Sequence, residues 1–128
     1  MNASMNPTLD RTMDPMDTMD PIWDTVDRLH GWLEAESELP PQQEVLLRML
    51  KLTEEVGEVA QAIIGATGQN PRKGTTHSWQ DVESELCDVI ITAMVALRTL
   101  TPDAPQVFAS HMGGVAERSL NGTSNATS

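Results

Sequence analysis

The sequence predicts a single all-α domain, and three observations support this prediction. Apolar residues recur every three or four positions in four separate segments, which is the spacing of one face of a helix. Clusters of proline or glycine separate these segments. No stretch alternates apolar and polar residues with β-branched enrichment, as a strand would. A chain of 128 residues has room for one such domain and for tails, but not for a second core.

The first predicted helix begins at Asp20-Pro21, where a capping side chain precedes a proline at the first helical position. It ends near Ser37, because Pro40-Pro41 breaks the chain. Residues 1–19 interleave Met, Asp and Pro without an apolar stripe, so they are predicted to be a disordered tail. The apolar face of the helix consists of Ile22, Val26, Leu29 and Leu33.

The second predicted helix runs from about residue 42 to residue 65, and a glycine-rich loop follows it over residues 65–71. Its apolar residues in register are Val45, Met49, Leu52, Val56, Val59 and Ile63. Ser78-Trp79-Gln80-Asp81 resembles a capping box with Asp in place of Glu or Gln, and it opens the third helix. The apolar residues of that helix are Val82, Leu86, Val89, Ile90, Ala93 and Leu97.

A fourth, shorter helix follows Thr101-Pro102-Asp103, which repeats the cap-then-proline signal. The folded domain is therefore predicted over residues 20–120, with residues 121–128 as a flexible tail. Four aromatic residues among these four helices make a thin core, and burial by one chain of this size is marginal. We expect the helical bundle to be completed by self-association as a dimer or tetramer. The apolar residues of the fourth helix are Val107, Phe108, Met112 and Val115.

The net charge of −11 argues against binding to a nucleic-acid polymer or to an anionic membrane surface. It permits a small phosphate ligand if a divalent cation lies between the two sets of negative charge. The single cysteine, Cys87, excludes an internal disulfide. No apolar run is long enough to span a bilayer and no secretory signal is evident, so a soluble, cytoplasmic protein without a membrane partner is predicted.

Two pairs of acidic residues on the second and third helices are the most informative feature. Glu55 and Glu58 form one pair, and Glu85 and Asp88 form the other. Residues three apart share one side of a helix, where like charges repel, and a hard cation with oxygen ligands would relieve that repulsion. One such pair alone usually lies on a solvated face, whereas two pairs on consecutive helices favour a metal site. A ferritin-like di-iron site requires Glu-x-x-His steps, which are absent here.

These residues stand in a longer two-part motif. It consists of Lys51-Leu52-Thr53-Glu54-Glu55-Val56-Gly57-Glu58-Val59-Ala60 and, on the next helix, Glu85-Leu86-Cys87-Asp88-Val89. The motif resembles the signature of the MazG-like all-α nucleoside-triphosphate pyrophosphohydrolases, over about residues 22–100. The phosphoribosyl-ATP branch of that family carries His four residues after the motif Asp, where this chain has Thr92.

The resemblance implies Mg²⁺-dependent hydrolysis of nucleoside triphosphates to a monophosphate and pyrophosphate, with Mn²⁺ as a possible substitute. It implies that Lys51 meets a phosphate oxygen. It also implies that a carboxylate, Glu54 or Glu55, accepts the proton of the attacking water, and the sequence does not choose between these two. The Mg²⁺ ligands that it implies are Glu55, Glu58, Glu85 and Asp88.

Candidates for the nucleotide side are less specific. Arg28-Leu29-His30 resembles a segment of the dCTP pyrophosphatase branch in which the His contacts the nucleotide, but His30 also fits a residue at the edge of the core. Trp79 and Trp32 either stack on a base or anchor the core, and Trp79 is the better candidate for stacking. Arg72 and Lys73 either close on the polyphosphate or are solvated loop charges.

Three functional hypotheses follow. The first is an enzyme of nucleotide-pool housekeeping, favoured because Lys51 and all the motif acids are present. The second is a catalytically weak regulatory protein that binds nucleotide without turnover. The third is a helical dimer with acidic surface stripes and no ligand.

Overall fold

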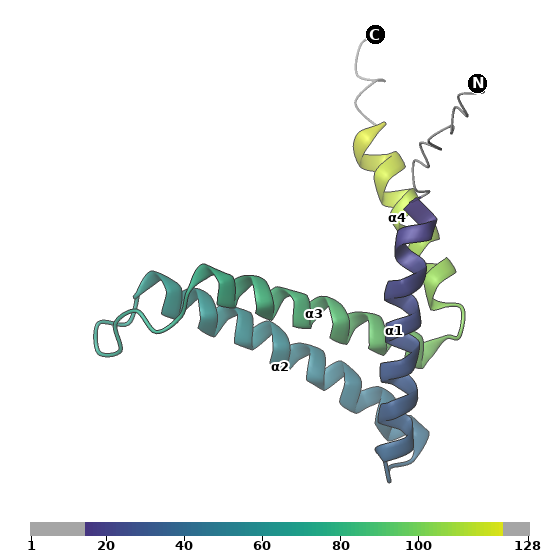
Figure 1. Cartoon of the computed structure of the whole chain (residues 1–128), viewed down its shortest axis with the longest axis horizontal. Helices are drawn as coiled ribbons and strands as arrows, with labels where there is room; N and C mark the ends of the chain where they lie inside the picture. Colours follow the sequence, from purple (N-terminus) through teal and green to yellow (C-terminus); the bar gives the residue numbers. More distant parts are fainter. Residues whose placement is uncertain (1–14, 122–128) are drawn as a thin grey trace, which may run out of the picture.

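In the computed structural model, which describes residues 15–121, four helices follow one another and no strand occurs in that range. They are α1 (Pro15–Glu36), α2 (Pro41–Thr67), α3 (Trp79–Leu100) and α4 (Ala104–Leu120). α2 and α3 lie antiparallel and form a long hairpin, which has the most extensive contact between any two helices. α1 crosses the end of the hairpin away from its loop, and α4 runs beside α1 (Figure 1). The predicted all-α class and the four helices are confirmed.

The small apolar core lies where α1, α3 and α4 meet. Trp23 and Val26 of α1 are buried there against Met94 and Val95 of α3, together with residues at the start of α4. The rings of Trp23 and Phe108 pack edge to face, with centroids 6.2 Å apart and planes inclined by 62°. This geometry is favourable for aromatic pairs. The core therefore holds the C-terminal half of α3, and α1 and α4 leave most of the length of the hairpin uncovered (Figure 1).

α1 begins earlier than the sequence predicts. The Asp20-Pro21 signal indicates a start at Pro21, but the helix starts at Pro15 and Pro21 lies inside it. An internal proline lacks the N–H for one helical hydrogen bond, which disfavours this arrangement. The half-buried Met19 packs against the core, and this contact offsets part of that cost. Residues 15–19 of the predicted tail are thus helical, while residues 1–14 and 122–128 lie outside the described range.

The turn between α2 and α3 follows the sequence signals closely. Gly68 ends α2 in a left-handed conformation with φ of 61°, and its N–H donates to the carbonyl of Gly65. At the start of α3, the Ser78 hydroxyl accepts from the N–H of Asp81 at 3.2 Å. The Asp81 carboxylate accepts from the N–H of Ser78 at 2.9 Å. The predicted capping box, with Asp at its third position, is confirmed.

None of the helices within residues 15–121 combines the length and the apolar character needed to cross a bilayer.

Candidate metal and nucleotide site

The face of α2 that is most deeply buried is not its apolar stripe. The predicted stripe includes Val56 and Ile63, which are exposed, while the other members are only half-buried. The buried residues of α2 include Arg48, Glu55 and Ala62, spaced seven apart, which is close to two helical turns. The sequence correctly predicts the helix but not which of its faces is buried.

Three carboxylates gather between the middle of α2 and the first half of α3. Glu55 and Glu58 lie one turn apart on α2, and Glu85 reaches them from α3. One oxygen from each side chain lies within 4.8 Å of the others. Glu55 retains only 9% of its exposure, and Glu58 and Glu85 are half-buried. We call Glu55, Glu58 and Glu85 the acidic cluster.

The acidic cluster has little positive charge to balance it. Lys51 Nζ lies 3.4 Å from Glu54 and 3.5 Å from Glu55. The neighbouring carboxylates, Glu54 above all, raise the pKa of Lys51. Arg48 is directed instead to Glu44, at 3.3 Å. Among the described residues Lys51 pairs with Glu54 and with one member of the cluster, Glu55, while Glu58 and Glu85 have no ion-pair partner.

Two oxygens of the acidic cluster are left without partners. Glu55 Oε2 and Glu85 Oε2 are buried, and neither has a hydrogen-bond partner in the described part of the chain. Burial, followed by the neighbouring Glu58 carboxyl, raises the pKa of Glu55 although Lys51 opposes the shift. A buried carboxylate oxygen without a partner is costly. The donor set is all oxygen and negatively charged, so the residues fit a hard divalent cation such as Mg²⁺.

The fourth predicted ligand does not join this group. Asp88 is exposed and lies outside the three-residue cluster, one turn beyond Glu85 on α3. Glu54, a candidate proton acceptor, is largely exposed and is held by Lys51. The structure therefore brings together three of the four predicted ligands and leaves Asp88 and Glu54 at the surface beside them.

The predicted nucleotide-side residues are dispersed. His30 is buried on α1, and its Nε2 lies 3.2 Å from Glu34 Oε1. This position agrees with the interpretation of His30 as a residue at the edge of the core. Trp79 and Trp32 are exposed, and within this chain neither anchors the core. Arg72 and Lys73 lie in the loop at the far tip of the hairpin, and no ion pair links them to the acidic cluster in the described residues (Figure 1).

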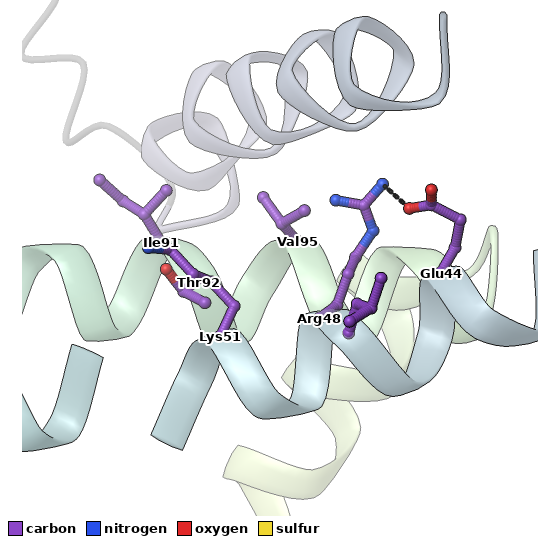
Figure 2. Close-up of a pocket in the computed structure, with 7 residues that line it drawn as sticks. Glu44, Arg48, Lys51, Ile91, Thr92 and Val95 are labelled. Atoms are coloured by element: carbon purple, nitrogen blue, oxygen red, sulfur yellow. Dashed lines mark hydrogen bonds and ion pairs between the residues drawn. The ribbon is translucent and has the colours of Figure 1, made fainter. Parts of the chain in front are cut away.

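One feature of the site is not predicted from the sequence. A cavity of about 300 Å³ lies between α2 and α3, with Arg48, Glu44 and Lys51 on its α2 side. Figure 2 shows the Arg48 guanidinium extending beside Val95 toward Glu44. The spacing of Arg48, Glu55 and Ala62 would have indicated this face, but an arginine seven residues before a glutamate is common on solvated helices as well.

Comparison with protein-family models, with curated proteins and with solved structures found no match to this chain. The likeness to the MazG-like enzymes therefore rests on the two-part acidic motif.

Proposed function

We propose that the protein is a Mg²⁺-dependent nucleoside-triphosphate pyrophosphohydrolase that releases a nucleoside monophosphate and pyrophosphate. The observation that carries this proposal is the acidic cluster. It combines carboxylates from two helices and two buried oxygens without partners among residues 15–121, and only Glu55 of the three is paired with a lysine. Such a group is electrostatically costly in the absence of a cation, and a ligand site is the simplest reason for it.

Glu55, Glu58 and Glu85 would hold the cation. When bound, Mg²⁺ supplies charge neutralisation at phosphoryl oxygens and lowers the pKa of a coordinated water. Lys51 stands beside the cluster with an exposed ammonium, so it can contact a phosphate oxygen of the substrate. Glu54 is the more accessible of the two candidate proton acceptors, because Glu55 Oε2 is buried.

Self-association belongs to the same proposal. Large apolar side chains remain exposed along the hairpin, including Leu46 at 65%, Leu50 at 64% and Ile90 at 58%. Exposed large apolar side chains in this number on two adjacent helices of a small domain favour an interface. We expect a second copy of the chain to cover the hairpin, which α1 and α4 leave open (Figure 1).

A catalytically weak nucleotide-binding protein is the second candidate. The observation that favours it is the position of Asp88 outside the acidic cluster, which leaves three carboxylates in the group rather than four.

The deciding experiment measures pyrophosphate and nucleoside monophosphate release from a panel of ribo- and deoxyribonucleoside triphosphates, with Mg²⁺ or with chelator. Mg²⁺-dependent release from any member supports the enzyme and identifies its substrate class. If folded protein binds nucleotide but releases no pyrophosphate from any triphosphate of the panel, the second candidate is favoured.

A further inference from the structure

The cavity beside Arg48 is placed next to the acidic cluster but is different in character. It is open to solvent on one side: its apolar walls are Leu47, Ile91 and Val95, of which Leu47 and Ile91 remain 45% and 43% exposed, and Arg48, Glu44 and Lys51 supply charge. A volume of about 300 Å³ lies at the lower end of small-molecule pockets. Apolar walls with a few polar groups are typical of sites that bind small molecules.

Arg48 carries an unused hydrogen-bond donor. The residue is only 8% exposed, and its Nε–H is buried without a partner in the described part of the chain. The ion pair that Arg48 makes within residues 15–121, from Nη2 to Glu44 Oε2, spans 3.3 Å, which is long for a charge-assisted hydrogen bond. Because no described residue satisfies this donor and Arg48 lines the cavity, its guanidinium has hydrogen-bonding capacity left for a ligand bound there.

The register of α2 relates this donor to the acidic cluster. Arg48 and Glu55 are seven residues apart and lie on the same buried face, which places them roughly 10 Å apart along the helix. Lys51 lies between them, lining the cavity and contacting Glu55. A nucleotide whose phosphates reach the acidic cluster therefore has its nucleoside within reach of the cavity.

We propose that this cavity binds the heterocyclic base of the nucleotide. The Arg48 guanidinium donates to a carbonyl oxygen or ring nitrogen of the base, and the Glu44 carboxylate accepts from an amino group or ring N–H. Leu47, Ile91 and Val95 cover the apolar surface of the ring. This assignment rests on the proposed function, because that function brings the phosphates to the acidic cluster.

The phosphate chain itself is a poorer occupant of the same cavity. Glu44 lies beside Arg48, is largely buried, and would repel a phosphate. A base edge carries both donors and acceptors, so it complements the arginine and the glutamate together.

The test compares the binding of nucleoside 5′-monophosphates with that of ribose 5-phosphate, which lacks a base, by calorimetry in the presence of Mg²⁺. We expect wild-type protein to bind at least one nucleotide tenfold or more tightly than ribose 5-phosphate. Arg48→Met keeps the aliphatic stem and removes the donor, so it should reduce this preference to threefold or less while the affinity for ribose 5-phosphate stays unchanged. Glu44→Gln is the second variant, and it should reduce the preference with little change in shape.

Gln43→Met makes a similar exchange at an exposed position of α2 and should leave the preference intact. If Arg48→Met retains its Tm but lowers the affinity for nucleoside 5′-monophosphates and for ribose 5-phosphate equally, Arg48 contacts the phosphate rather than the base. That result, an unchanged preference in both variants, or no preference in the wild type would overturn the assignment.

Turnover measured on the same preparations separates the two proposals. Pyrophosphate release with an unaltered base preference in the variants would refute only the base pocket. Base-dependent binding that needs Arg48, without release from any triphosphate, would refute only the enzymatic proposal.

Discussion

Glu55 on α2 and Glu85 on α3 each carry a buried carboxylate oxygen without a hydrogen-bond partner among residues 15–121, and their side chains approach within 4.8 Å across the helix interface. Proteins ordinarily satisfy buried polar atoms, and two unsatisfied anionic groups facing each other are doubly unfavourable. The relationship is understandable if the hairpin is arranged for a cation. It predicts that a bound cation stabilises the fold and that the removal of one acid abolishes this stabilisation.

Glu58→Gln tests the acidic cluster directly. The substitution removes one charge while keeping the shape of the side chain, so Mg²⁺ binding and pyrophosphate release should fall by about 100-fold or more. Without Mg²⁺, the variant should be equally or slightly more stable, by about 0.5 kcal/mol, since a like-charge repulsion is removed. Thermal unfolding without Mg²⁺ measures the change in stability. Its repetition with Mg²⁺ measures the loss of binding, because a ligand that binds only the folded state raises Tm. The pyrophosphate assay measures the loss of release.

Glu83→Gln is the matched control, since Glu83 is exposed on α3 and lies outside the cluster. It should keep the Mg²⁺-dependent rise in Tm. An equal rise in wild-type protein and in Glu58→Gln would contradict a metal role for the cluster.

The capping box predicts an acid-sensitive contribution to stability. The backbone N–H of Ser78, with smaller help from the Ser78 side chain and His77, lowers the pKa of Asp81 below its ordinary value of 3.8. Because the folded-state pKa is the lower one, the stabilisation is present above the unfolded-state pKa and is lost as pH falls through the folded-state value. In urea unfolding, the free energy of unfolding should be higher for wild type than for Asp81→Asn at pH 6–7, and this difference should narrow below about pH 4. If the difference in the free energy of unfolding were the same at pH 6–7 and below about pH 4, the shape of the Asp81 side chain and not its charge would be the cause.

The sequence predicts local structure well where side chains act on their own backbone. The break at Pro40-Pro41, the loop after α2 and the start of α3 at Ser78 all follow from such local rules, and the structure confirms them. The start of α1 does not follow, because the helix extends back past Pro21 to Pro15 and its Met19 packs against a core formed by distant parts of the chain.

The site is predicted only in part for a related reason. The motif spacing brings Glu55 and Glu58 together on one side of α2, and the helix pairing adds Glu85. Hydrophobic periodicity identifies a stripe of α2 that is only partly covered in the described chain, because Val56 and Ile63 are exposed, while the most buried positions lie to one side of that stripe. The cavity beside Arg48 lies on the face that is actually buried, so periodicity could not reveal it.

Gly65→Ala tests the packing of the loop against the end of α2. A Cβ at Gly65 would overlap the His77 ring and the Thr76 hydroxyl, so the loop has to move. We expect a loss of about 1–3 kcal/mol in the free energy of unfolding, as for other overpacked positions. Gly31→Ala is the control, since nothing lies within 4 Å of the added methyl group. It should stabilise α1 by about 0.5–1 kcal/mol. Equal effects of both substitutions in urea unfolding would contradict the predicted clash.

Charge placed on the open face of α2 tests self-association. Leu46 and Leu50 lie one turn apart and are 65% and 64% exposed, so they belong to the apolar surface that a second copy is expected to cover. Sedimentation analysis of wild-type protein at micromolar concentration should give a dimer or a larger assembly. The double substitution Leu46→Glu and Leu50→Glu should shift it to monomer, because glutamates cannot be buried unpaired in an interface. Gln42→Glu adds charge at an exposed position at the start of α2 and should leave the assembly intact.

A monomeric wild type would refute the interface. An oligomer that survives the double substitution would place the interface elsewhere on the hairpin, for instance around Ile90 of α3, where Ile90→Glu repeats the test.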